Sequence, residues 1–330
     1  MARPQTVAII LVAILVVAGV IVYFALPGGQ GGKQLTSVKV GETYTSTSTA
    51  YLQAGIQNGY FAKYGLNVST VRFSSVTLLV AALLKGDVQL ALGTAGDVAF
   101  FDAAGGNARI VATYAQHVVF SVVAPSNYTT PQSLVGKVAV VTTTSGSDYL
   151  AIALMLNASG IKPTALHYLP GGSSVPARLS LVENGEGQVT AVIPDYLPLL
   201  KGTNLHVMAN ASAFPERVAW DTVYGLDPYL TTNRKTIDSF MLGLNETHTW
   251  FTTNRTGASQ VINSYLKLGN LSQAESTWDA WQPAWSASIK PDLAGVKNYI
   301  GLISYFNPTL SSAVPTGMVD VSYYNDTLHQ

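Results

Sequence analysis

The sequence contains no cysteine and few charged side chains. Without cysteine the chain has no disulfide, no thiol nucleophile, no cysteine-ligated zinc or iron–sulfur cluster, and no lipid-modified cysteine. Charged residues make up 11% of the 330 residues, against about 25% in an ordinary soluble protein, and the formal net charge is zero. Binding to nucleic acid relies on clustered Lys and Arg, so this balance argues against nucleic acid as a partner.

The sequence also lacks the common enzyme motifs. It has no His-Glu-x-x-His, no Gly-x-Ser-x-Gly, no phosphate-binding Gly-x-x-x-x-Gly-Lys-Ser/Thr and no dinucleotide glycine fingerprint. The five histidines are widely spaced and do not form a metal-ligand pattern; they are His117, His167, His206, His248 and His329. We therefore predict no catalytic residue, no metal and no cofactor.

One long apolar run lies near the N-terminus. The segment from Val7 to Leu26 has no charged or amide side chain, and as a helix it spans roughly 30 Å, the thickness of a bilayer core. We predict that residues 1–26 form an uncleaved, single-pass membrane anchor with the body outside the cell; a cleaved signal peptide is the alternative. The glycine-rich residues 27–36 then form a flexible linker.

Sequons for N-glycosylation are more frequent than chance predicts. Asn-x-Ser/Thr occurs at eight positions: Asn67, Asn127, Asn157, Asn210, Asn245, Asn254, Asn270 and Asn325. A chain rich in Ser and Thr also collects sequons by accident. We nevertheless predict a glycosylated surface, which agrees with an extracytoplasmic body.

The body alternates between strand and helix patterns in two similar runs. In the first run the predicted strands are 37–44, 66–73, 88–92, 109–114 and 117–124, and the predicted helices are 49–63, 76–85 and a short one from 97. In the second run the strands are 137–141, 165–169, 188–193 and 205–208, and the helices are 147–158, 175–183 and 194–200. This alternation predicts an α/β fold with parallel sheets covered by helices on both faces.

The remaining chain is mostly helical. Helices are predicted at 236–251 and 257–268, from a capping box at Ser272–Glu275, and at 292–306 with Pro291 at the first position. Three tryptophans on one face of the third helix, Trp278, Trp281 and Trp285, favour packing over a carbohydrate platform.

Five segments resemble substrate-binding proteins of nitrate, sulfonate, taurine and thiamine-pyrimidine transporters. Residues 54–68 (AGIQNGYFAKYGLNV) resemble the family's Gly-Tyr/Phe-Phe, Gly-Leu-x-Val opening. Residues 83–94 (LLKGDVQLALGT) and 133–140 (SLVGKVAV) are similar to its Gly-x-x-Asp segment and its entry to the second lobe. Residues 145–150 and 194–196 match in place. The order of these segments, more than any one of them, carries the resemblance.

The resemblance implies a two-lobed periplasmic-binding-protein-like fold of type II with a helical C-terminal portion. Lobe one would comprise residues 37–120 plus 215–330, and lobe two residues 121–214. Such a protein captures a small solute (sulfonate, nitrate, taurine or pyrimidine-like) in the cleft between its lobes. It delivers the solute, as a monomer, to the permease of an ABC transporter. An anchor combined with many sequons points to an archaeal cell with a single membrane.

The carboxyl ends of the strands, where helix N-termini point, are the expected site in this fold. The predicted ligand-binding residues at these ends are Thr45, Ser46, Thr47, Ser74, Ser75, Thr94, Ala95, Gln116, Thr144, Ser145, Gly146, Ser147, Asp195 and Tyr196. Ser75 and Ser147 also suit simple helix caps, and Gln116 with His117 suits a hinge. Arg72 could anchor an anion, although a paired arginine is the ordinary case.

Two other functions remain open from the sequence. A receptor of the same fold could feed a sensor, and an anchored surface protein would have no solute at all. The low charge is a property of the body as well as of the anchor. Such a surface suits an extracytoplasmic protein kept soluble by hydroxyls, amides and glycans, including one in an acidic medium.

Overall fold

The computed structural model describes residues 34–330 except 145, 305–309, 311–312, 314 and 329–330. The predicted anchor and most of the predicted linker lie outside these residues, and the first strand begins at Thr36. No helix within the described residues is both long and apolar enough to cross a membrane. Residues 36–330 cluster as one unit.

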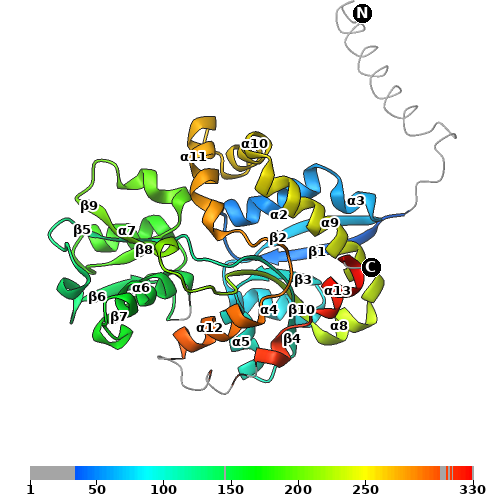
Figure 1. Cartoon of the computed structure of the whole chain (residues 1–330), viewed down its shortest axis with the longest axis horizontal. Coiled ribbons are helices and arrows are strands. Elements are labelled where there is room, and N and C mark those ends of the chain that lie inside the picture. The colour runs from blue at the N-terminus through cyan, green and yellow to red at the C-terminus, as the bar shows by residue number, and fades with distance from the viewer. Residues whose placement is uncertain (1–33, 145, 305–309, 311–312, 314, 329–330) are drawn as a thin grey trace, which may run out of the picture. The chain divides into compact units, whose positions relative to one another are not determined.

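A five-stranded sheet, here called the large sheet, has the order β2-β1-β3-β10-β4 (Figure 1). Its strands are β1 (Thr36–Glu42), β2 (Leu66–Arg72), β3 (Leu90–Gly93), β4 (Ala108–Ala115) and β10 (Asp221–Leu226). β1 pairs in parallel with β2 and β3, whereas β10 is antiparallel to both β3 and β4. The central strands are buried on both faces because helices cover them, as in other α/β sheets.

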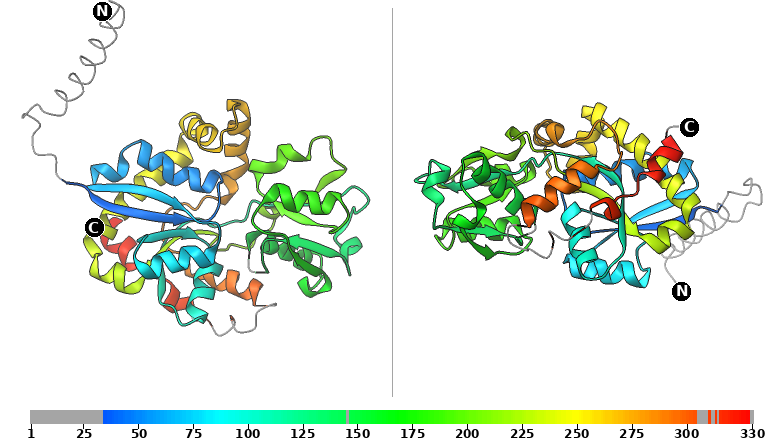
Figure 2. Two further views of the ribbon diagram at one scale, coloured as in Figure 1. Left: turned by 180° about the vertical axis from the view of Figure 1, so that it is seen from behind. Right: turned by 60° about the horizontal axis from the view of Figure 1, so that its bottom comes forward.

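The same order recurs in the second run of the chain. The strands are β5 (Ser121–Pro125), β6 (Val138–Val141), β7 (His167–Pro170), β8 (Thr190–Val192) and β9 (Leu205–Asn210). They form the sheets β8-β5-β9 and β6-β7, here called the small sheets, and a parallel bridge from Ala139 to Val189 joins the two. The combined order β7-β6-β8-β5-β9 matches that of the large sheet, which confirms the predicted repeat (Figure 2).

The prediction of wholly parallel sheets is wrong for β5 and β10. The chain crosses from the large sheet to the small sheets between Ala115 and Ser121, and it returns between Asn210 and Asp221. Each strand that follows a crossing, β5 and β10, inserts antiparallel between two strands of its sheet. The sequence analysis assigned no strand to residues 221–226 because local pattern does not report this long-range pairing.

Twelve α-helices cover the sheets in the described residues. They are α2 (Thr47–Gln57), α3 (Tyr60–Lys63), α4 (Val76–Lys85), α5 (Ala95–Ala103), α6 (Ser147–Ala158), α7 (Val175–Glu183), α8 (Asp227–Thr232), α9 (Arg234–Thr253), α10 (Arg255–Leu266), α11 (Leu271–Trp281), α12 (Leu293–Ile303) and α13 (Ser322–Leu328). Two 3₁₀ helices, η3 (Pro194–Leu200) and η5 (Gln282–Ala284), matter for the site. The bounds of α4, α6 and α7 agree with the sequence prediction.

Three helix predictions need correction. The predicted helix over 49–63 divides into α2 and α3 because Gly59 adopts a left-handed conformation with φ 72°. The capping box at Ser272 does not form; Asn270 caps α11 by accepting a hydrogen bond from the N–H of Gln273 (3.2 Å). Pro291 precedes α12, whose cap is Asp292, which accepts from the N–H of Gly295 (3.0 Å).

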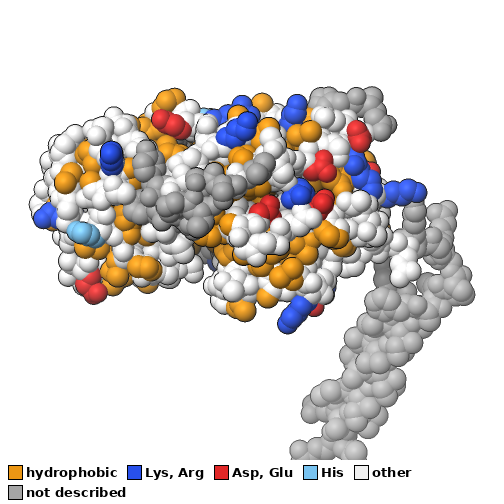
Figure 3. Space-filling view, turned by 90° about the horizontal axis from the view of Figure 1, so that it is seen from below, with side chains coloured by type: hydrophobic (Ala, Val, Ile, Leu, Met, Phe, Trp, Pro, Cys, Tyr) orange, Lys and Arg blue, Asp and Glu red, His pale blue; other side chains and the backbone are white. Residues whose placement is uncertain are grey.

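The tryptophans of α11 serve packing, as expected. Trp281 is fully buried, and the indole N–H of Trp278 donates to the carbonyl of Phe251 (2.9 Å). Trp285 lies beyond the end of α11, so the three do not share one helix face. On the outside, charged side chains are few and scattered among uncharged ones, as one face shows (Figure 3).

Candidate ligand-binding site

The first turn of α2 is a buried row of hydroxyls. Ser46 is the N-cap residue in an extended conformation, and its N–H donates to the hydroxyl of Thr49 (3.0 Å). Ser46, Thr47, Ser48 and Thr49 are each at most 1% exposed. The turn contains no acidic side chain of its own, so the positive end of α2 is open to a carboxylate from elsewhere.

That carboxylate is Asp195, which follows β8 at the start of η3. The hydroxyl of Thr47 donates to Asp195 Oδ1. Burial raises the pKa of Asp195 to about 6, and hydrogen bonds from Thr47 and the nearby indole N–H of Trp281 oppose this rise. The structure therefore brings together two predicted site residues, one from each run of the chain.

Asp221 forms a second buried carboxylate beside the same turn. The hydroxyl of Tyr44 donates to Asp221 Oδ1 (2.9 Å), and the side chain is 1% exposed. Burial raises the pKa of Asp221 to about 7; Tyr44 and Ser48 lower it by hydrogen bonding, while the negative charge of Asp97 adds to the rise. Sequence reasoning missed Tyr44 and Asp221. An aspartate opening the apolar stretch TVYGL was the available signal.

Five stacked aromatic rings run past both carboxylates. Successive ring centroids, from Trp220 through Trp281, Trp285 and Tyr51 to Tyr114, are 5.0, 5.4, 5.9 and 4.6 Å apart. We call this series the aromatic ladder. Trp281 lies beside Asp195, and Tyr114 lies close enough to Asp221 for the carboxylate to raise its pKa. The ladder spans four separate segments, so no single sequence pattern announces it.

Thr94 and Ser147 come together around Tyr299 of α12. Thr94 caps α5 by accepting from the N–H of Asp97 (3.2 Å), and Ser147, the first residue of α6, accepts from the indole N–H of Trp220 (2.9 Å). Burial raises the pKa of Tyr299, and the hydroxyls of Thr94 and Ser147 lower it by hydrogen bonding. α12 contacts both α5 and α6, so it joins the two runs at this point (Figure 2).

Other predicted site residues have local roles or lie outside. Ser74 and Ser75 are exposed, and Ser75 caps α4 by accepting from the N–H of Leu78 (3.3 Å). Arg72 is paired with Glu42 (2.6 Å), so it is not a free anion anchor. Thr144 is exposed, and Ser145 lies outside the described residues.

The last four predicted residues line the approaches to the two crossings. Gln116 lies in the first crossing, where its N–H donates to Ala284 (2.7 Å) and its carbonyl accepts from Val218 (2.8 Å). Ala95 is buried with its N–H bonded to Ala219 (3.2 Å). The remaining residues are half-buried: Thr45, Gly146 and Tyr196.

Several buried polar atoms of the site have no hydrogen-bond partner among the described residues. They are Asp195 Oδ2, Asp221 Oδ2, Trp281 Nε1, Trp285 Nε1, Gln282 Nε2 and the Tyr114 hydroxyl. Buried polar groups are nearly always satisfied in proteins, and the exceptions call for an explanation. Here they gather around the Thr47–Asp195 contact and the aromatic ladder, which supplies both donors and acceptors for a small polar molecule.

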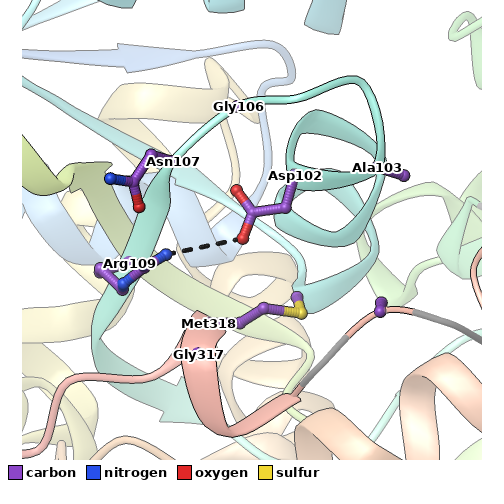
Figure 4. A pocket seen from close by; sticks show the side chains of 8 residues that line it. Asp102, Ala103, Gly106, Asn107, Arg109, Gly317 and Met318 are labelled. Carbon is purple, nitrogen blue, oxygen red and sulfur yellow. Dashed lines mark ion pairs between the residues drawn. The ribbon is translucent and has the colours of Figure 1, made fainter.

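Two surface pockets lie away from these groups. The first, of about 400 Å³, is lined by Asp102, Ala103, Gly106, Asn107, Arg109, Ala313, Gly317 and Met318 (Figure 4). Arg109 points across it toward Asp102 (3.7 Å), so its charge is already paired. The second, of about 270 Å³, lies between α4 and α8. Neither contains a predicted site residue.

The sequon asparagines lie at or near the surface. Six are exposed: Asn67, Asn127, Asn157, Asn210, Asn270 and Asn325. Asn245 and Asn254 are half-buried, and Asn254 caps α10 by accepting from the N–H of Gly257 (3.0 Å). Glycosylation itself stays a prediction.

The repeated sheet order and the helix N-termini gathered between the two runs define a mixed α/β, periplasmic-binding-protein-like fold. The alkanesulfonate-binding protein SsuA from Xanthomonas axonopodis pv. citri, bound to MOPS, superposes with a TM-score of 0.69 at 17% identity, over 87% of this chain and 99% of that one. The periplasmic aliphatic sulphonate binding protein SsuA from Escherichia coli has a TM-score of 0.68 at 17% identity (88% and 99% covered). The periplasmic nitrate-binding protein NrtA from Synechocystis PCC 6803 has a TM-score of 0.71 at 13% identity (90% and 89% covered).

The chain belongs to the family described as "NMT1/THI5 like", whose sequence model matches residues 46–255. No curated protein sequence matches it. The recognised resemblance to solute-binding proteins of ABC transporters is therefore confirmed at the level of the family and the fold.

Proposed function

We propose that the protein is an extracytoplasmic solute-binding receptor that captures a small polar solute between its large and small sheets. The two halves correspond to the lobes predicted at residues 37–120 plus 215–330 and 121–214. The observation that carries this proposal is the set of unpaired buried polar atoms around the Thr47–Asp195 contact. Closing the two halves on a solute would satisfy them and remove the solute from water.

Delivery to an ABC permease is the second part of the proposal. The structural neighbours named for sulfonate and nitrate binding support it, as does the family. The predicted anchor would hold the receptor, as a monomer, at the outer face of the membrane beside its permease. No covalent step is proposed: His248, the histidine next to the aromatic ladder, binds the carbonyl of Ser286 through Nε2 (2.9 Å) and holds no nucleophile.

Ligand-induced stabilisation tests the proposal. The full chain, purified in detergent, is heated with nitrate, alkanesulfonates, taurine and pyrimidines, and solute that co-purifies is identified by native mass spectrometry. A solute at about 100 times its Kd stabilises the folded state by about 2.7 kcal/mol, which is a clear shift in melting temperature. Absence of both a shift and a co-purifying solute would sink the receptor function.

A further inference from the structure

The candidate site holds two buried carboxylates without a cation. Asp195 is 9% exposed and Asp221 is 1% exposed, and neither forms an ion pair in the described residues. In each, one oxygen accepts a hydrogen bond from a hydroxyl while the second, Oδ2, has no partner. Burial of a charge without a partner is unfavourable, so a group that supplies positive charge here would bind favourably.

The arginines nearest to these carboxylates are committed elsewhere. Arg72 pairs with Glu42 (2.6 Å), Arg178 with Asp148 (3.4 Å) and Arg217 with Asp292 (2.5 Å). Every lysine within the described residues is exposed. The undescribed positions between 305 and 314 contain neither Lys nor Arg. The chain thus provides no free cation with which to bind an anionic solute at this site.

The positive end of α2 is also occupied. Thr47 gives its hydroxyl to Asp195, and Ser48 lies against Asp221. A nitrate or sulfonate arriving there would find the donors taken and would add a third negative charge next to two buried ones. The aromatic ladder makes the opposite charge more favourable, because aromatic rings attract ammonium and guanidinium groups.

We propose that the solute carries a cationic amino or amidine group, which binds the free oxygens of Asp195 and Asp221 beside the aromatic ladder. This inference rests on the proposed receptor function and narrows its solute. It separates the chain from the structural neighbours named for sulfonate and nitrate binding. Donors such as the Trp281 indole N–H and the Gln282 amide remain available for an acceptor on the same solute.

Matched solutes test the inference. Taurine and ethanesulfonate differ only in an amino group, and 4-aminopyrimidine and pyrimidine form a second pair. Binding to the full chain in detergent is measured by calorimetry and by thermal shift, with nitrate included. We expect the amino member of at least one pair to bind ten times more tightly or better. Equal or tighter binding of ethanesulfonate or nitrate would overturn the inference while leaving the receptor function intact.

Two isosteric variants locate the charge. Asp195→Asn and Asp221→Asn keep the shape of each side chain, and we expect each to weaken the amino solute at least tenfold. Asp87→Asn, at an exposed position, is the matched control and should change nothing. Circular dichroism verifies that each variant folds. Folded variants that bind the amino solute as the wild type does contradict the inference; if no solute binds the wild type and none co-purifies, the receptor function itself fails.

Discussion

The hydroxyl of Thr47 donates a hydrogen bond to the carboxylate of Asp195, although 148 residues separate the two in the chain. The donor lies in the first turn of α2, and the acceptor follows β8. The contact therefore joins the large sheet to the small sheets at the positive end of a helix, where a negative charge is most stable.

Removal of this contact should destabilise the protein. Thr47→Val keeps the shape of the side chain but removes the donor, so that Asp195 loses a hydrogen bond while it remains buried. We expect a loss of about 1–3 kcal/mol in the free energy of unfolding, measured by denaturant titration. Thr77→Val, at an exposed position of α4, is the control. Equal stability of the two variants would show that the contact contributes nothing.

The protein should become less stable as pH rises through the range of 4 to 7. In the folded state the pKa of Asp195 is raised to about 6 and that of Asp221 to about 7, whereas an aspartate in an unfolded chain titrates near about 3.9. The folded state thus binds more protons than the unfolded state between these values, and the added stability is lost as pH rises through the folded pKa values.

Melting temperatures from pH 8 to pH 5 measure this effect. Asp221→Asn should raise the melting temperature at pH 8 and flatten its dependence on pH. Two groups oppose the trend or modify it: the buried His248, whose pKa is lowered, resists protonation in acid, and Asp97 adds negative charge near Asp221. A melting temperature that falls steadily from pH 8 to pH 5 in the wild type would be inconsistent with the raised pKa values.

Trp281 should report on the site. Trp281→Phe removes an indole N–H next to Asp195 and one ring of the aromatic ladder, and we expect a raised Asp195 pKa together with reduced stability. Tryptophan fluorescence should change when a solute binds, and this change should shrink in Trp281→Phe. The matched variant Trp278→Phe should retain it, because that indole binds the carbonyl of Phe251 instead. Equal signals from both variants would place the solute elsewhere.

The sequons should differ in occupancy. Asn157 is exposed at the end of α6, whereas Asn254 is half-buried with its side chain engaged as the cap of α10. In a glycosylating host we therefore expect a glycan at Asn157 and less, or none, at Asn254, as measured by glycopeptide mass spectrometry. Asn254→Ala should in addition cost about 1 kcal/mol through the lost cap, and Asn254→Asp should not. A fully occupied Asn254 would contradict this ranking.

Local sequence determined most of the helices and the class of fold. Ser75 and Gly86 bound α4, and the bounds of α6 and α7 follow from an equally local pattern of apolar residues and stop signals. The repeat of strands and helices predicted the two runs, and the hydroxyls at helix starts pointed to Thr47, Thr94 and Ser147. These features depend on neighbours within a few residues, which a linear sequence displays.

Tertiary structure alone decided the antiparallel β10, the pairing of Asp195 with Thr47 and the aromatic ladder. Asp221 is buried because β10 inserts between β3 and β4, strands more than 100 residues earlier in the chain. Which carboxylate meets which helix end, and whether any cation lies near it, depends on how the two runs pack together. For that reason the sequence left a bound anion and a polar heterocycle equally open, whereas the buried charges of the folded chain favour a cationic group.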